Sequence, residues 1–159
     1  MKILFVCLGN ICRSPLAEAI LNKKIGDKKM TNLFQVDSCG TSNYNLGDDP
    51  DPRTIRCASK NNLPISHKAR QLNPWDIENF NLILAMDESN YQNILRIAPL
   101  SLHRSKVKLL RSYDSEGDGD VPDPYYGGEK DFDDVYRILD RSIDALLTEL
   151  MTDYSDFSY

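Results

Sequence analysis

KILFVCLGNICRSP, residues 2–15, contains both a strand and the start of a helix, and the rest of the chain is arranged around it. The apolar run 3–6 predicts a short buried strand that ends on Cys7. Ser14 suits a helix cap and Pro15 a first helical position, so a helix is expected from Pro15. A cysteine between a strand and a helix N-terminus is typical of a nucleophile held above an anion-binding cradle.

The loop between this strand and this helix has the residue types that such a cradle needs. Gly9 and Asn10 are the residues best able to adopt positive φ, which a tight loop requires. Arg13 has a planar guanidinium that matches two oxygens of a phosphate. Backbone N–H groups, the helix dipole and Arg13 all favour an anion, so Cys7 is expected to be a reactive thiolate at neutral pH.

Length and composition predict one domain and exclude several classes of partner. The chain has 159 residues, 41% of them hydrophobic, and a formal net charge of −5. Basic residues form no stripe, so nucleic acid is not expected as a partner. No apolar run approaches the roughly 18 residues of a membrane span, and the early strand leaves no space for a signal peptide. We expect a cytoplasmic protein that does not insert into membranes, with its four cysteines reduced.

Hydrophobic periodicity predicts strands that alternate with helices. Breaker residues make 112–130 a long loop, which in a compact domain is usually functional. Asp51 is expected to cap the helix that follows it. The expected strands are 3–6, 33–37, 82–86 and 106–110, and the expected helices are 15–25, 52–60, 73–79, 88–98 and 132–150.

This alternation predicts an α/β fold with three α/β/α layers and a central four-stranded parallel sheet, flavodoxin-like or Rossmann-like. Residues 1–150 form the expected domain, and 151–159 form an expected short polar tail. Ligands of such sheets bind beyond the carboxyl ends of the strands. Cys7, Ser38 and Asp87 are expected to lie at that edge.

A thiolate that attacks phosphorus needs a partner acid, because a phenoxide or alkoxide leaves poorly without a proton. The long loop offers Asp123, framed by two prolines, together with Asp118 and Asp120. Asp51 is a further candidate, and any of the last three could instead be a solvated charge or a helix cap. The residues alone leave the choice among these four carboxylates open.

Residues 6–15, VCLGNICRSP, are similar to the signature of the low-molecular-weight protein tyrosine phosphatases. The likeness covers about residues 3–150 and also rests on DS at 37–38, DPDPR at 49–53, HKAR at 67–70, MDESN at 86–90 and DPYYG at 123–127. It implies hydrolysis of phosphotyrosine in proteins and of small aryl phosphates, with acid phosphatase activity. The reaction would pass through a cysteinyl phosphate and need no cofactor or metal.

The resemblance also implies the catalytic roles of three residues. Cys7 would be the nucleophile and Asp123 the general acid. Arg13 and the loop amides would hold a phosphate or another tetrahedral oxyanion.

Further roles around the loop follow from the same resemblance. Ser14 would donate to the Cys7 sulfur, and Ser38 and His67 would support Asn10. Tyr44 and Tyr125 would form the walls of a slot that favours a flat aryl group. The implied substrate-binding residues are Leu8, Gly9, Asn10, Ile11, Cys12, Ser14, Tyr44, Tyr125 and Tyr126.

Two other functions could use the same kind of loop. An arsenate reductase ordinarily needs a relay of further reactive cysteines, and no cysteine follows Cys57. A non-catalytic phosphotyrosine-binding module would be expected to have lost Cys7, Arg13 or Asp123. Phosphotyrosine-containing proteins are therefore the expected partners.

Two weaker patterns lead to separate hypotheses. Cys12 shares the loop with Cys7 and could trap an oxidised Cys7 as a disulfide, which would make inhibition by peroxide reversible. Residues 114–119 resemble the start of a calcium loop, but Tyr125 stands where that loop needs its last acidic ligand.

Overall fold

A computed structural model of the chain describes residues 1–156. The strands are β1 (Lys2–Cys7), β2 (Gln35–Gly40), β3 (Leu82–Ala85) and β4 (Val107–Leu109). The helices are α1 (Arg13–Asp27), α2 (Pro52–Lys60), α3 (Pro74–Asn79), α4 (Glu88–Arg96), α5 (Ser101–Arg104) and α6 (Glu129–Asp156), with a 3-10 turn at Leu110–Tyr113.

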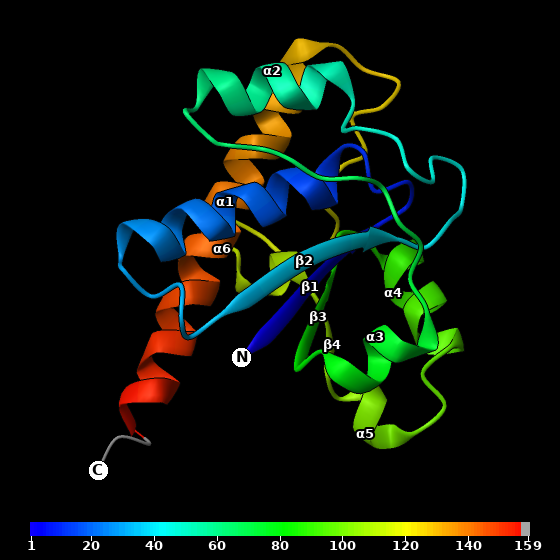
Figure 1. Cartoon of the computed structure of the whole chain (residues 1–159), viewed down its shortest axis with the longest axis vertical. Helices are drawn as coiled ribbons and strands as arrows, with labels where there is room; N and C mark the ends of the chain where they lie inside the picture. The colour runs from blue at the N-terminus through cyan, green and yellow to red at the C-terminus, as the bar shows by residue number, and fades with distance from the viewer. Residues whose placement is uncertain (157–159) are drawn as a thin grey trace.

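The four strands form one parallel sheet in the order β2-β1-β3-β4 (Figure 1). β1 is an inner strand, with Phe5 opposite Ser38 on one side and Leu84 on the other. The predicted three-layer α/β/α fold with a four-stranded parallel sheet is therefore confirmed. All the strands run toward the same edge, where Cys7 ends β1.

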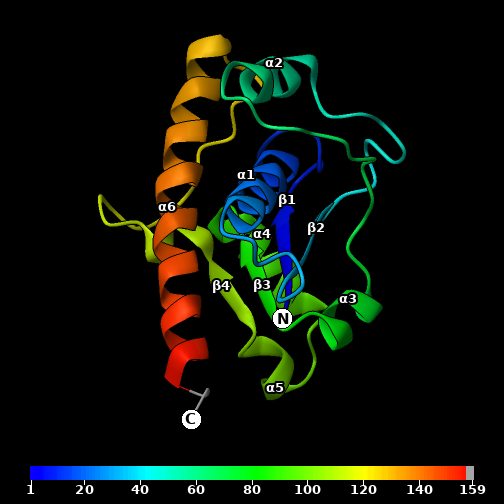
Figure 2. The ribbon, with the colours of Figure 1, turned by 60° about the vertical axis from the view of Figure 1, so that its left-hand side comes forward.

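Alternation along β1 explains the two layers of helices. Ile3 and Phe5 belong to the apolar cluster beneath α1 and α6, whereas Leu4 and Val6 belong to the cluster beneath α3 and α4. Figure 2 shows the sheet between these two sets of helices. All four of these side chains are fully buried, and each such burial stabilises the fold by about 1.5–3 kcal/mol.

Two helices have side-chain caps at their starts, and the cap expected at Asp51 is confirmed. Asp51 caps α2 by accepting a hydrogen bond from the Arg53 N–H, and Pro52 stands at the first helical position. Asn73 caps α3 with a reciprocal capping box through Asp76. These caps fix where the chain enters each helix.

The start of α1 differs from the prediction. The helix begins at Arg13 with Cys12 as its N-cap, so Ser14 is inside the first turn and does not cap it. The side chain of Ser14 is instead hydrogen-bonded to Cys7 and Asn10, which outweighs its preference for a cap position. The early start brings the helix N-terminus directly against the loop.

Other boundaries differ where tertiary contacts outweigh local pattern. β2 covers 35–40 instead of 33–37, because its pairing with β1 continues to Gly40. Ser38 is consequently inside the strand and not at its end. The short helix α5 is absent from the prediction, and the last helix starts at Glu129 instead of Phe132.

The expected tail is largely helical. Residues 151–156 continue α6, and 157–159 lie outside the described residues. None of the helices within residues 1–156 combines the length and hydropathy of a membrane-spanning segment.

Candidate active site

The loop 8–12 carries the chain from the end of β1 directly into α1, so Cys7 faces a helix N-terminus. The side chain of Cys12, the N-cap, makes no capping hydrogen bond, which leaves the first N–H groups of α1 without a side-chain partner. These groups and the macrodipole of a 15-residue helix favour an anion at the loop. The Asn10 N–H also donates to Cys7 Sγ at 3.3 Å.

Asn10 holds the loop in a left-handed conformation with φ 57°. Its Oδ1 accepts hydrogen bonds from the Arg70 N–H at 3.0 Å and from His67 Nε2 at 2.7 Å. Its Nδ2 donates to Ser14 Oγ at 2.8 Å and to Ser38 Oγ at 3.0 Å. The side chain is almost fully buried, so these four bonds offset a conformation that costs about 1–3 kcal/mol.

Gly9 does not have the positive φ that we predict for it, and Asn10 alone takes that conformation in this loop. A Cβ at this position would lie 2.6 Å from Nδ2 of Asn45, whose amide donates to the Gly9 carbonyl. A larger residue here would therefore have to displace the Asn45 side chain from the loop.

Ser14 connects this network to Cys7. Its Oγ accepts from Asn10 and lies 2.9 Å from Cys7 Sγ. Because the Asn10 amide occupies an acceptor site of the hydroxyl, the Ser14 hydrogen is available to the sulfur. Ser14 and Cys7 are both buried.

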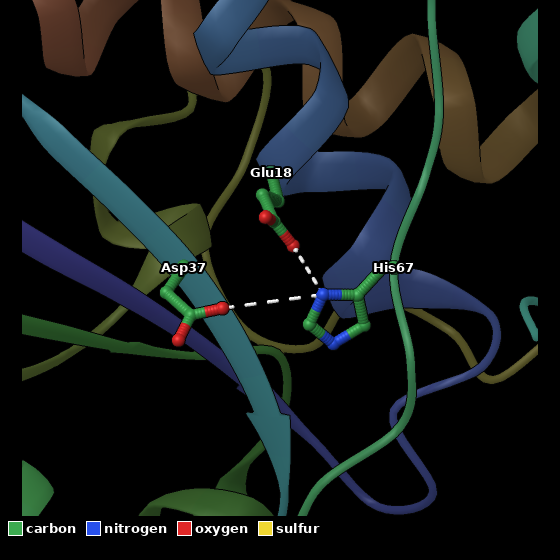
Figure 3. Close-up of side chains that lie close together, drawn as sticks. All are labelled: Glu18, Asp37 and His67. Atoms are coloured by element: carbon green, nitrogen blue, oxygen red, sulfur yellow. Dashed lines mark ion pairs between the residues drawn. The ribbon is translucent and has the colours of Figure 1, made fainter. Parts of the chain in front are cut away.

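His67 contacts the loop through Nε2, and its other ring nitrogen faces two acidic side chains, Glu18 and Asp37 (Figure 3). Its Nδ1 is 3.1 Å from Glu18 Oε2 and 3.9 Å from Asp37 Oδ1. Within residues 1–156 this is the one group of three cation-ligand side chains with atoms within 4.8 Å of one another. Glu18 already accepts from Ser38 and Asp37 already pairs with Arg70. A metal ion would have to displace these contacts, so we assign the group to support of the loop.

Arg13 is buried under the loop, with 2% of its surface exposed. One terminal nitrogen donates to Asp87 Oδ2 at 2.7 Å and to the Val121 carbonyl at 2.8 Å, and the other lies 3.7 Å from Asp123 Oδ2. Burial acts to lower the pKa of Arg13, but the neighbouring charges of Cys7, Asp87 and Asp123 raise it above its ordinary value. The guanidinium is thus a fixed positive charge beside the thiol.

Asp123 is the carboxylate that the fold brings to Cys7. Its Oδ1 accepts from the Tyr125 N–H, and it lines the same pocket as Cys7 and Arg13. The three competing carboxylates do not line that pocket. Asp51 caps α2 and Asp120 accepts from the first N–H of α4, while Asp118 lies on the loop before Asp120.

The pocket above the loop has a volume of about 260 Å³. Leu8, Gly9, Ile11 and Cys12 line it on the loop side, whereas Asn10 and Ser14 lie behind the loop. Tyr44, Tyr125 and Tyr126 line its mouth, and their exposed fractions are 76%, 44% and 97%. The rings of Tyr125 and Tyr126 meet edge to face, with centroids 5.0 Å apart. A phosphorylated aromatic side chain would find an anion site at the base and aromatic surfaces at the mouth.

A family model of low molecular weight phosphotyrosine protein phosphatases matches residues 2–156. The chain belongs to this family. Phosphotyrosine hydrolysis by a cysteine-dependent mechanism is the activity of the family, and the resemblance stated from the sequence is confirmed.

Three similar proteins illustrate the range of the family. The low molecular weight phosphotyrosine protein phosphatase of Gallus gallus is 43% identical, with 92% of this chain and 93% of that protein covered. A crystal structure of a protein tyrosine phosphatase from Entamoeba histolytica has a TM-score of 0.93 at 37% identity, with 97% and 99% of the two chains covered. A Drosophila arginine phosphatase has a TM-score of 0.87 at 33% identity, with 94% and 98% covered.

Three further thiols accompany Cys7 in this phosphatase. All four cysteines are free and buried. Burial, with smaller contributions led by Asp51, raises the pKa of Cys12 to about 12. Burial also raises the pKa of Cys57 to about 11 and that of Cys39 well above its ordinary value. Neither Cys39 nor Cys57 lines the pocket, so the described residues contain no relay of reactive cysteines.

Sequence reasoning missed three supporting residues of this phosphatase. Asp87 is expected at the carboxyl edge of the sheet, but its hydrogen bond with Arg13 is not predicted by any local pattern. Asn45 lines the pocket, and nothing in the local sequence singles it out. Arg53 donates to the Gly127 carbonyl and lies 5.6 Å from the centre of the Tyr125 ring. Only the fold could reveal this contact between α2 and the loop that carries Asp123.

Proposed function

We propose that Cys7, Arg13 and Asp123 carry out phosphotyrosine hydrolysis in two steps. The carrying observation is that Asp123, which is far from Cys7 and Arg13 in the sequence, lines the same pocket as these two residues beyond the carboxyl end of β1. The Cys7 sulfur attacks phosphorus and forms an S–P bond as the bond to the tyrosyl oxygen breaks. Asp123 protonates that oxygen, and then accepts a proton from the water that attacks phosphorus and breaks the S–P bond.

Arg13 and the loop amides bind the equatorial oxygens in both steps, where charge develops in the transition state. Arg13 does not need to be oriented by the substrate, because Asp87 and the Val121 carbonyl already hold it. Ser14 stabilises the sulfur as it leaves phosphorus in the second step. Inorganic phosphate and other tetrahedral oxyanions are expected to compete with substrate at this site.

Substitution of the nucleophile and the acid tests these roles. Cys7→Ser is expected to abolish turnover, with Cys57→Ser as a control for a buried thiol outside the pocket. Asp123→Asn is expected to lower kcat about 100-fold or more for leaving groups that need a proton, and Asp118→Asn should have little effect. Equal losses of kcat in the Asp123 and Asp118 variants would show that Asp123 is not the general acid.

Protein phosphotyrosine is the proposed substrate, and small aryl phosphates are proposed as further substrates, including at acidic pH. Tyr44 and Tyr125 support this choice, because ring contacts favour a flat aryl group over an aliphatic one. The similar Drosophila protein is an arginine phosphatase. Phosphoarginine is therefore the substrate that should be compared with phosphotyrosine in activity assays. A higher kcat/KM for phosphoarginine peptides than for matched phosphotyrosine peptides would contradict the proposal.

The alternatives have less support. An arsenate reductase would need reactive thiols beyond Cys12 in the pocket of Cys7, and neither Cys39 nor Cys57 lines that pocket. A pure binding module would not need Asp123.

We also propose a cytoplasmic location, because four free cysteines suit a reducing compartment.

A further inference from the structure

A second hollow, of about 450 Å³, lies beside the catalytic pocket. Leu8 and Tyr44 line both, so the two hollows share a wall. Its lining comes from the loops after β1 and β2, from the segment before α3 and from the C-terminal end of α4. We call this second hollow the flanking groove.

The flanking groove has a mixed lining that suits a polypeptide. Leu72 and Ile97 are partly buried and offer apolar surface. Gln71 and Asn93 supply amides at the same surface. Aliphatic surface with nearby amide groups is typical of sites that bind extended peptide segments, which need both contact area and backbone hydrogen bonds.

Arg96 gives the groove its charge. It is the one cationic residue that lines the groove, no carboxylate lines it, and the side chain is exposed. Its hydrogen bond is to the neutral Asn93 Oδ1 at 2.8 Å, and no ion pair joins it to a described carboxylate. Because the chain as a whole has a formal charge of −5, this local cation is what an acidic segment would meet at the groove.

We propose that the flanking groove binds the substrate residues next to phosphotyrosine and prefers an acidic side chain there, through Arg96. This inference rests on the proposed function. Successive residues of an extended peptide are about 3.3 Å apart, so a groove that shares a wall with the tyrosine pocket is within reach of the nearest few residues. Tyr44 separates the phosphotyrosine ring from this segment.

The test compares matched phosphotyrosine peptides in which one flanking position at a time carries Asp, Asn or Lys. For the unaltered phosphatase we expect kcat/KM to fall from Asp to Asn to Lys at positions on one side of the phosphotyrosine. Exposed charge pairs contribute about 0.2–1 kcal/mol, so the step from Asp to Asn is expected to be up to about five-fold. Arg96→Glu should reverse the order.

Lys28→Glu is the matched control, because it makes the same charge change at the C-cap of α1, outside the groove. It should leave the order unchanged, and neither variant should alter hydrolysis of para-nitrophenyl phosphate, which is too small to reach the groove. An unchanged order in Arg96→Glu, or the same reversal in Lys28→Glu, would overturn the inference. Failure of the unaltered protein to hydrolyse para-nitrophenyl phosphate would instead count against the proposed function.

Discussion

Asn10 is the residue on which the shape of the active-site loop depends. It has positive φ, and four hydrogen bonds hold its amide. No neighbour in sequence provides these bonds, apart from Ser14. The cradle is therefore pre-organised by contacts with β2 and with the segment around His67, before any substrate arrives.

Asn10→Ala should impair both stability and catalysis. Unpaired buried partners cost about 1–3 kcal/mol, so the free energy of unfolding should fall by about that amount. The relaxed loop should also lower kcat/KM. Chemical unfolding and phosphatase assays measure the two effects.

Asn62→Ala is the matched control for this substitution, because Asn62 is exposed and also has positive φ, 55°. Its strain alone should cost about 1 kcal/mol and leave kcat/KM unchanged. If Asn10→Ala also left kcat/KM unchanged, the hydrogen-bond network would have no role in catalysis.

Cys12 offers a second prediction at the level of single residues. Its raised pKa, about 12, keeps it a neutral thiol, so Cys12→Ser should keep phosphatase activity. If Cys12 condenses with a sulfenic acid on Cys7 to give a disulfide and water, a thiol reductant should restore peroxide-treated protein. If the reductant restored the activity of peroxide-treated Cys12→Ser equally well, this hypothesis would be wrong.

Among the elements, the loop between β4 and α6 has the least regular structure and carries the proposed acid. Residues 114–128 contain no strand or helix. Arg53 on α2 fixes its far end, through Gly127 and Tyr125, while it also pairs with Asp51. The acid is therefore positioned by a helix that has no catalytic residue of its own.

Arg53→Ala should weaken catalysis through the loop. We expect a larger loss of kcat for substrates with poor leaving groups than for para-nitrophenyl phosphate, because only the former depend strongly on a placed acid. Arg56→Ala is the control. Arg56 lies on α2 like Arg53, and its substitution removes an exposed ion pair with Glu129 of α6. A uniform loss over all leaving groups would show that Arg53 acts on stability and not on the acid.

At the scale of the whole molecule, ion pairs of Asp114 connect two elements that are distant in sequence, beside the apolar core under α6. Its carboxylate is fully buried and accepts from Arg141 and Arg111, so it joins α6 to the turn after β4. These contacts, Arg141 first, hold its pKa well below the ordinary value. The resemblance of residues 114–119 to a calcium loop thus has a different explanation, because Asp114 belongs to an internal ion pair.

This pair should make stability depend on pH. The unfolded carboxyl has a pKa of about 3.9, and the folded pKa is lower. The stabilisation is therefore complete above about pH 5 and decreases as the pH falls through the folded pKa. Asp114→Asn should cost about 3 kcal/mol at pH 7, and much less at pH 2.

Urea unfolding at the two pH values measures this dependence. Asp134→Asn, which alters an exposed carboxylate on α6, should change the free energy of unfolding far less. A loss in Asp114→Asn that is the same at both pH values would contradict the assignment.

The sequence predicts the architecture well where one local signal is decisive. The apolar run at 3–6 and the stripe from Phe132 locate the central strand and the longest helix, and the sheet follows from the alternation of elements. It does not predict that Ser38 is inside β2, because the end of that strand depends on pairing with β1. Arg53 and Asp87 act across the fold, and no local pattern records such contacts.

Identification of the phosphorylated residue tests the central claim most directly. The Asp123→Asn protein is mixed with a phosphotyrosine peptide labelled on phosphorus, quenched in acid and digested, and the labelled fragment is sequenced. We predict that the label is on Cys7 and is absent from Cys7→Ser. Label on another residue, or turnover by the unaltered protein with no covalent label at any time after mixing, would contradict the mechanism.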